Sequence, residues 1–283
     1  MTTTIQNATL SAEIKHFGAE LISLKTNQNK EYIWEGNPKF WGKHAPILFP
    51  IVGTLKNNSF QYEGTDYSLS RHGFARDMAF ELIHSTQSSA TFALQSSAET
   101  LKGYPFEFEL QISYTLEENN LAVAYHVRNK GKSKMPFAIG AHPAFALPNE
   151  FDNYAIAFEK EESLEYYILE DDLVSNKTKK LKVDDTIIPL NYELFKNDAL
   201  IFKTLESNSL TILENKNPVL KVHFEGFPSL GIWTKMNAPF ICIEPWFGYS
   251  DTTESTGDLF EKEGIQILES NDAFQSKYSI ELL

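Results

Sequence analysis

The strongest constraint on the fold of this chain is a strict alternation of apolar and polar residues in two neighbouring segments. In residues 107–115 the apolar positions are Phe108, Leu110, Ile112 and Tyr114, and polar side chains lie between them. A period of two predicts a β-strand with one buried face. The alternation resumes over residues 121–128, after a polar run that is typical of a turn. The two segments therefore predict a β-hairpin.

Shorter strand-like runs, separated by Gly, Asn, Asp or Pro, recur along the chain at residues 19–24, 59–62, 67–69, 79–83, 91–94, 154–158, 209–213, 219–224 and 240–243. Helical periodicity is confined to brief stretches at residues 98–102, 192–195 and 258–261, too short to connect parallel strands. The prediction is an all-β fold, a large antiparallel β-sandwich with a few short helices. The polar stretch 159–185 is expected to form an elaborated loop or a hairpin at the sandwich edge. With 283 residues and 42% hydrophobic content, we expect one domain over residues 1–283.

The charge balance excludes some partners. The chain carries a formal net charge of −13, with acidic residues spread along its length. Such a surface repels polyanions, so nucleic acid and anionic membranes are not expected as partners. A neutral small molecule is indifferent to this charge, whereas a phosphorylated one needs a local basic patch.

Targeting and redox signals are few. Residues 1–10 lack the basic start and apolar run of a secretory signal, and no later stretch is long and apolar enough to span a membrane. Cys242 is the only cysteine, which excludes an intramolecular disulfide and agrees with a reducing, cytoplasmic setting. Its neighbours Ile241 and Ile243 indicate a small buried apolar residue rather than a nucleophile.

Three segments, residues 71–77, 140–145 and 243–251, break the alternation and concentrate His, acidic, Gly, Pro and aromatic residues. Such compositions are typical of rigid loops shaped around a ligand. Each also has a purely structural interpretation: His72 could cap a turn, His142 could satisfy a nearby carbonyl, and Glu244 could be half of a buried ion pair. Glu244 follows an apolar run and precedes a proline and aromatics. Desolvation there should raise its pKa toward the range useful to a general base.

In this order, the three segments resemble the aldose 1-epimerase (galactose mutarotase-like) family, and specifically its LacX-type branch. The most characteristic stretch is Ala-Pro-Ile-Leu-Phe-Pro-Ile-Val-Gly at residues 45–53, followed by His-Gly-Phe-Ala-Arg-Asp at residues 72–77. The resemblance implies a galactose mutarotase-like supersandwich that binds a sugar or sugar phosphate, as a monomer or homodimer. It also implies ring-opening epimerisation at the anomeric carbon, which needs neither a metal nor another cofactor.

The resemblance also implies roles for individual residues. Glu244 matches the general base that takes the proton of the C1 hydroxyl, and His142 matches the general acid that protonates the ring oxygen. His142 should then be at least partly protonated at working pH. His72 and Asp198 match positions that bind sugar hydroxyls, although Asp198 equally suits a turn before residues 199–202. Trp246 is our choice for an aromatic face against the sugar, whereas Trp34, Phe40 and Trp41 form a second aromatic cluster that we assign to the core.

One departure from the family pattern leaves the substrate open. Mutarotases of free sugars usually carry an arginine shortly after the early Val-Gly, where this chain has Thr54. Arg71 or Arg76 could replace it. In the related hexose-6-phosphate epimerases, arginines of this segment help to hold phosphate, for which Arg71, Arg76 and Lys43 are available here. Arg76 could instead pair with the adjacent Asp77.

Three rival functions have lower priority. A non-catalytic carbohydrate-binding protein on the same fold is the main alternative. A metal hydrolase with His72, His142 and Glu244 as ligands lacks the usual paired-ligand spacings. A glycosidase needs two acidic residues facing the bond, and only Glu244 has a persuasive setting.

Overall fold

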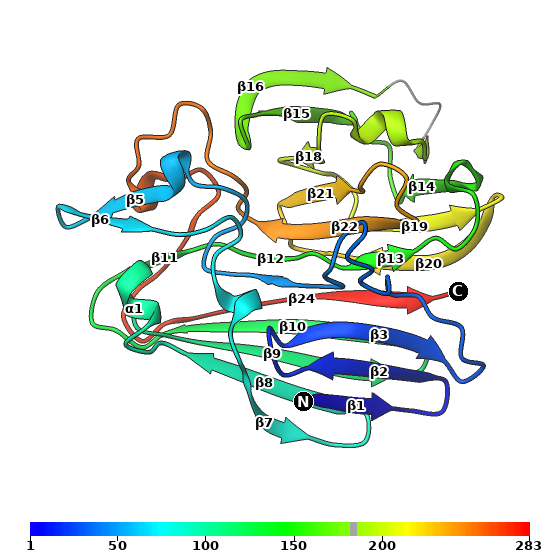
Figure 1. Cartoon of the computed structure of the whole chain (residues 1–283), viewed down its shortest axis with the longest axis horizontal. Coiled ribbons are helices and arrows are strands. Elements are labelled where there is room, and N and C mark those ends of the chain that lie inside the picture. The colour runs from blue at the N-terminus through cyan, green and yellow to red at the C-terminus, as the bar shows by residue number, and fades with distance from the viewer. Residues whose placement is uncertain (182–185) are drawn as a thin grey trace.

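The structure is a computed structural model that describes residues 1–181 and 186–283. Its strands form two large sheets and three small ones (Figure 1), and every pairing between its named strands is antiparallel. The prediction of a large antiparallel β-sandwich with a few short helices is therefore confirmed.

The nine-stranded sheet runs through the middle of the molecule. Its order is β17 (Ile187–Pro189), β14 (Tyr154–Phe158), β19 (Ser209–Glu214), β20 (Asn217–His223), β24 (Ala273–Leu282), β10 (Asn120–Asn129), β9 (Phe108–Glu117), β8 (Ser89–Gln95) and β7 (Glu81–Ser85). The hairpin predicted from residues 107–128 is β9 and β10, which pair from Phe108 opposite Asn129 to Glu117 opposite Asn120. In Figure 1 the C-terminal strand β24 lies beside β10, so the end of the chain is at the centre of this sheet.

The eight-stranded sheet carries the residues of most interest. Its order is β16 (Leu173–Lys180), β15 (Glu165–Glu170), β18 (Leu200–Phe202), β21 (Ser229–Trp233), β22 (Phe240–Phe247), β12 (Ile139–Ala141) and β4 (Ile47–Leu48), with β13 (Ala144–Ala146) also paired to β22. The β15–β16 hairpin at the edge of this sheet matches the expectation for the stretch 159–185, of which residues 182–185 lie outside the described residues.

The remaining elements are small. Three strands form an N-terminal sheet, β1 (Thr2–Gln6), β2 (Leu10–Lys15) and β3 (Glu20–Thr26); the two-stranded sheets are β5 (Ser59–Tyr62) with β6 (Thr65–Ser68) and β11 (Met135–Phe137) with β23 (Gln266–Leu268). The α-helix is α1 (Thr100–Gly103), and the 3₁₀ turns are η1 (Lys56–Asn58), η2 (Ala75–Asp77), η3 (Phe151–Asn153), η4 (Tyr192–Phe195) and η5 (Leu259–Glu261). All three predicted helical stretches thus contain a helical turn.

Alternation along β22 decides which side chains face the core and which face the other side of the sheet. Ile241 and Ile243 belong to the main hydrophobic cluster together with residues of the nine-stranded sheet. The even-numbered positions Cys242, Glu244 and Trp246 project from the opposite face, because successive side chains of a strand alternate. β22 therefore seals the core with one face and offers polar groups with the other.

Two of the segments expected to be loops prove to be partly strands. Residues 140–141 and 144–145 belong to β12 and β13, and residues 243–247 continue β22. The prolines hid this, because Pro143 and Pro245 cannot donate to a ladder and usually mark its ends. Here the pairing tolerates them: β12 ends and β13 begins on either side of Pro143, next to the middle of β22.

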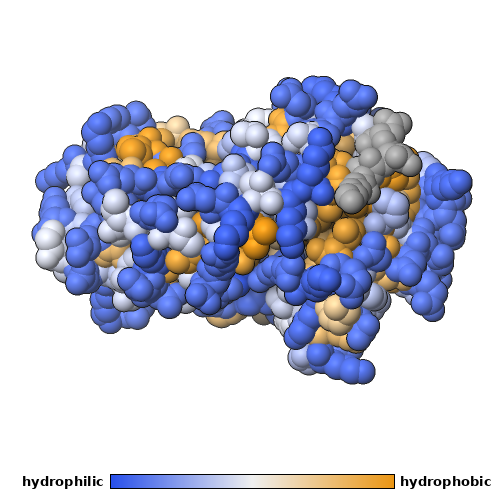
Figure 2. Space-filling model, turned by 90° about the horizontal axis from the view of Figure 1, so that it is seen from above, coloured by the Kyte–Doolittle hydropathy of each residue, from blue (hydrophilic) through white to orange (hydrophobic). Residues whose placement is uncertain are grey.

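The outer surface agrees with the acidic, polar composition. Seen from the side of the β15–β16 edge, it is mostly hydrophilic, with apolar residues showing between the polar ones (Figure 2). Among the described residues, no helix is long and apolar enough to cross a membrane.

Candidate active site

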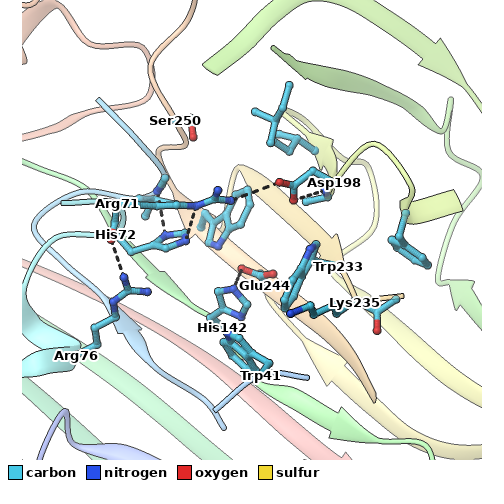
Figure 3. A pocket seen from close by; sticks show the side chains of 18 of the residues that line it. Trp41, Arg71, His72, Arg76, His142, Asp198, Trp233, Lys235, Glu244 and Ser250 are labelled. Atoms are coloured by element: carbon cyan, nitrogen blue, oxygen red, sulfur yellow. Dashed lines mark hydrogen bonds and ion pairs between the residues drawn. The ribbon is translucent and has the colours of Figure 1, made fainter. Parts of the chain in front are cut away.

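A cavity of about 470 Å³ opens on the face of the eight-stranded sheet that points away from the core. This size suits a small-molecule ligand, because such sites span about 300–1,000 Å³. All seven residues predicted to form the site line it: Arg71, His72, Arg76, His142, Asp198, Glu244 and Trp246. Four segments far apart in the sequence therefore meet at one cavity, as the close view shows (Figure 3).

Strand register brings the two proposed proton-transfer groups together. Gly140 pairs with Trp246, and Ala144 pairs with Cys242. The position midway, His142, must then lie opposite Glu244 across the interruption between β12 and β13. Directly opposite residues on antiparallel strands lie close enough for their side chains to meet. His142 Nε2 is 3.2 Å from Glu244 Oε2, and the two side chains point toward one another in Figure 3.

The pair is buried and incompletely hydrogen-bonded. Glu244 is 2% exposed and His142 is 7% exposed. Glu244 Oε2 and His142 Nδ1 have no hydrogen-bond partner among the described residues, since the contact at 3.2 Å is not aligned as a hydrogen bond. Buried polar atoms without partners are rare in folded proteins, and they point to a bound group that is needed to satisfy them.

Burial shifts the pKa of each group in the direction that favours its neutral form. Desolvation raises the pKa of Glu244 well above its ordinary value, an effect that the nearby Arg71 cation and the Trp246 indole partly offset. Desolvation, together with the cations of Arg76 and Arg71, lowers the pKa of His142 to about 3. Both shifts favour the neutral form of the group concerned, and the lowered pKa of His142 runs against the expectation of a protonated imidazole in the unliganded site.

Aromatic rings hold His142 in place. The Trp41 ring stacks on the imidazole with centroids 4.8 Å apart and planes 25° from parallel. Trp233 meets it edge-on at 5.8 Å, and the ring of His72 does so at 5.7 Å. A flat ring packed on one face and two edges has little freedom, so Nε2 keeps its direction toward Glu244.

The choice of Trp246 as the open aromatic surface is not supported. Trp246 lines the cavity, but it is only 5% exposed. A Cβ added at Gly140 or at Gly231 would overlap its indole, so the ring covers both glycines. The half-buried rings in the cavity wall are those of Phe40, Trp41 and Trp233. Trp41, which we had assigned to the core, therefore offers more surface to a ligand than Trp246 does.

His72 is fixed from the opposite wall. Its backbone N–H donates to the carbonyl oxygen of Gly53 at 2.8 Å, and the Gly53 N–H donates to His72 Nδ1 at 3.1 Å. Burial is the main reason why the pKa of His72 lies well below its ordinary value, and the nearby His142, Arg71 and Arg76 also lower it. The imidazole is therefore neutral, and its other nitrogen, Nε2, faces the cavity side.

The arginines differ in how they are engaged. Arg76 donates from Nη2 to the carbonyl oxygen of Arg71 at 2.8 Å, and its Nε lies 3.4 Å from Asp77 Oδ2. Lys43 also pairs with Asp77, at 2.9 Å. Arg76 thus pairs with Asp77, as its structural alternative predicts, but it also lines the cavity, and its Nε has no hydrogen-bond partner among the described residues, whereas Lys43 does not line the cavity. Thr54 is buried beside Ser250 and does not line the cavity.

Asp198 occupies a loop before β18 with a left-handed backbone, φ 84°. Its Oδ1 accepts a hydrogen bond from the Ala199 N–H at 2.7 Å, as expected for a turn residue, and its Oδ2 lies 3.8 Å from Arg71 Nη2. Asp198 therefore agrees with both interpretations of its sequence: it shapes the turn, and it also lines the cavity.

A possible metal-ligand set differs from the one considered from sequence. Within the described chain, ligand atoms of His142, Cys242 and Glu244 lie within 4.8 Å of one another, whereas His72 is not part of the group. Cys242 is fully buried, does not line the cavity, and has a pKa that burial raises well above its ordinary value. These properties favour the buried apolar interpretation of Cys242.

Sequence reasoning missed several residues of the cavity wall, among them Trp233, Lys235 and Ser250. Trp233 could have been found, because the short non-polar run Leu230-Gly231-Ile232-Trp233 is typical of a buried strand. Lys235 is exposed and donates to the Phe40 carbonyl oxygen at 3.0 Å. No local pattern marks it, because its place at the cavity follows from the turn between β21 and β22.

Comparison with known proteins agrees with this architecture. The sequence profile of the family described as aldose 1-epimerase matches residues 1–264. The chromosomal LacX protein of Lactococcus lactis subsp. lactis is 34% identical over 302 aligned positions that cover 100% of both chains.

Two solved structures are also similar. A galactose mutarotase related enzyme from Lactobacillus acidophilus has 36% identity and a TM-score of 0.96, covering 100% of this chain and 97% of its own. A galactose mutarotase-like protein from Lactobacillus casei ATCC 334 has 32% identity and a TM-score of 0.94, with 100% of both chains covered. The family match over nearly the whole length, with the ordered site residues at one cavity, shows that this chain belongs to the aldose 1-epimerase family.

Proposed function

We propose that this protein is a cofactor-independent aldose 1-epimerase that interconverts the α and β anomers of an aldohexose or its phosphate. Glu244 acts as the general base and His142 as the general acid. The observation that carries the proposal is the buried Glu244 carboxyl group, with one oxygen unpartnered, 3.2 Å from His142 Nε2 at the floor of the cavity.

The chemistry needs two proton transfers at adjacent oxygens of one sugar. Glu244 takes the proton of the C1 hydroxyl while His142 gives a proton to the ring oxygen; the C1–O5 bond breaks and a C1 carbonyl forms. Rotation about C1–C2 presents the other carbonyl face, and the reverse transfers close the ring as the other anomer. No electrons leave the sugar, so proton transfer by two side chains completes the reaction.

The proton count of the site suits this cycle. Ring opening starts from a carboxylate and an imidazolium and ends with a carboxylic acid and a neutral imidazole, so the pair holds one proton throughout. The unliganded pair favours the second arrangement, since burial raises the pKa of Glu244 and lowers that of His142. The direct contact between them lets the proton move to His142 when the sugar replaces the missing hydrogen bonds.

The first experiment replaces Glu244 by Gln, which keeps the shape and removes the base. We expect anomer exchange, followed by polarimetry or NMR with glucose, galactose and their 6-phosphates, to fall by about 10²–10⁴-fold. Sugar affinity should change little. Glu254→Gln, at an exposed acidic position, is the matched control and should retain wild-type turnover.

Three results would count against the proposal. Unchanged turnover in Glu244→Gln would reject the base. A wild-type protein that binds these sugars without exchanging anomers would favour the non-catalytic carbohydrate-binding alternative. Activity that disappears on chelation and returns with a metal would favour the metal-dependent alternative.

A further inference from the structure

The hydrogen bonds around His72 cannot all form at once. Gly53 N–H lies 3.1 Å from Nδ1, and Arg71 Nε lies 3.3 Å from Nε2. A neutral imidazole has one acceptor nitrogen and one N–H. The Gly53 N–H is a buried backbone donor with a fixed direction and would be unpaired without Nδ1, whereas the arginine side chain can turn. Nδ1 is therefore the acceptor, and Nε2 carries the hydrogen.

It follows that two donors face each other across 3.3 Å on the cavity wall, the Nε–H of Arg71 and the Nε2–H of His72. They cannot bond to one another. A single oxygen placed between them on the cavity side would accept from both. Asp198 Oδ2 lies 3.8 Å from Nη2 of the same guanidinium group, so an acceptor lines the cavity next to this arginine. Two donors that share one oxygen, with an acceptor on the same arginine, suit a hydroxyl group, which both accepts and donates.

The charge around Arg71 favours a neutral group over a phosphate. Asp172, at the tip of the β15–β16 hairpin, accepts from Arg71 Nη1 at 2.9 Å, and Asp198 lies on the other nitrogen of the fork. The two terminal nitrogens of the Arg71 guanidinium, which would bind a phosphate in a bidentate manner, thus both face carboxylates. Figure 3 shows the Arg71 side chain extended between His72 and Asp198.

We propose that Arg71 and His72 donate jointly to one hydroxyl oxygen of a neutral sugar, and that Asp172 is a positioning residue that holds Arg71 over the cavity. This proposal rests on the proposed function for the identity of the ligand as a sugar. The β15–β16 hairpin, which contributes no proton-transfer group, would then contribute to sugar affinity.

The test measures sugar affinity and turnover separately, on purified full-length variants. Arg71→Ala should raise both Kd and KM for the free sugar that the wild type uses by about 10–100-fold, the effect of losing a hydrogen bond from a charged donor. The kcat should also change, because the Arg71 cation lowers the pKa of both Glu244 and His142, so the rise in Kd measured by direct binding is the readout of the hydroxyl contact. Asp172→Asn should raise the same two constants about two- to fivefold, as for an exposed ion pair.

Controls separate positioning from a general charge effect. Asp171→Asn removes the same charge from the same turn, and Asp171 makes no ion pair within the described residues, so its Kd should match wild type. Adding Asp172→Asn to Arg71→Ala should have no further effect, because Asp172 acts through Arg71.

Each contrary result has its own meaning. An unchanged Kd in Arg71→Ala, or equal effects of Asp171→Asn and Asp172→Asn, would overturn the inference while leaving the epimerase proposal in place. A loss confined to 6-phosphates would make Arg71 a phosphate ligand and overturn the hydroxyl assignment. A wild type that binds sugar through Arg71 yet exchanges no anomers would overturn the proposed function alone.

Discussion

At the residue scale, the site depends on a carboxyl group and an imidazole that are both denied solvent. Either group alone in this position would be driven to its neutral form by desolvation. Because His142 Nε2 and Glu244 Oε2 lie 3.2 Å apart, one proton can transfer directly between the two groups without passing through solvent. A sugar that supplies hydrogen bonds to Glu244 Oε2 can then shift the proton toward His142.

The raised pKa of Glu244 should be measurable as a pH dependence of stability. Above its ordinary pKa of 4.5 the carboxyl group of the unfolded chain is ionised, whereas in the folded chain it keeps its proton up to the raised pKa. The folded state then loses stability as pH rises. Glu244→Gln removes this effect. We therefore expect its free energy of unfolding, relative to wild type, to increase as the pH rises above 4.5, by up to about 1.4 kcal/mol per pH unit, until the pH reaches the raised pKa of Glu244 in the folded chain.

Urea denaturation of both proteins over this pH range is the measurement. His142 contributes with the opposite sign, because its lowered pKa adds stability as pH rises from about 3 to 6.5, and this contribution is common to both proteins. Parallel stability curves would show that Glu244 is ionised in the folded state.

At the scale of elements, glycines on the neighbouring strands make room for the large side chains of β22. Gly231 on β21 pairs with Glu244 on β22, and Gly140 on β12 pairs with Trp246 on β22. The indole of Trp246 covers both glycines and ends beside the carboxyl group. Small residues on β12 and β21 therefore decide where an aromatic ring on β22 can lie.

Gly231→Ala tests this packing. The added methyl group would overlap the outer ring of the indole, and overpacking of this kind costs about 1–3 kcal/mol. We expect that loss in the free energy of unfolding, together with a lower kcat because the ring is displaced toward Glu244. Gly42→Ala is the matched control, since its Cβ would have only ordinary contact with Pro38. Equal stability of the two variants would contradict the packing argument.

At the scale of the whole molecule, loops from distant parts of the chain are joined on one side of the cavity. Ser250 Oγ accepts from the Thr54 N–H, and Asp251 Oδ2 accepts from the Lys56 N–H. Asp251 Oδ1 also pairs with Lys262 at 2.9 Å, and both side chains are almost fully buried. Burial lowers the pKa of Lys262, while Asp251 opposes that shift. These contacts hold the segment that contains Gly53, the partner of His72, against the end of β22.

Asp251→Asn should therefore destabilise the protein strongly. It would leave the Lys262 ammonium buried without its counter-charge, a change that costs about 3–5 kcal/mol in comparable sites. Chemical denaturation measures the loss. Glu263→Gln, which breaks the more exposed pair of Lys203 and Glu263, is the control and should cost about 1 kcal/mol or less. A similar cost for both variants would mean that Asp251 and Lys262 do not act as a buried pair.

Much of the fold followed from local patterns. The alternation in β9 and β10 predicted a hairpin, and the short apolar runs predicted nine further strands, because a half-buried strand imposes its period on the sequence directly. The strands β1, β2 and β24 were not predicted. The extension of β22 to Phe247 was missed, because Pro245 ordinarily ends a strand. The organisation as one domain, the cytoplasmic setting and the oligomeric state stay predictions.

By itself, the sequence determined the fold class and seven of the residues that line the cavity, since alternation and the ordered motifs are properties of neighbouring positions. Only the tertiary structure decided that His142 lies opposite Glu244, that Trp41 and not Trp246 offers an open ring, and that Asp172 reaches Arg71. The physical reason is that strand register, burial and the resulting pKa shifts depend on which segments pair across the molecule, and no local stretch of sequence contains that information.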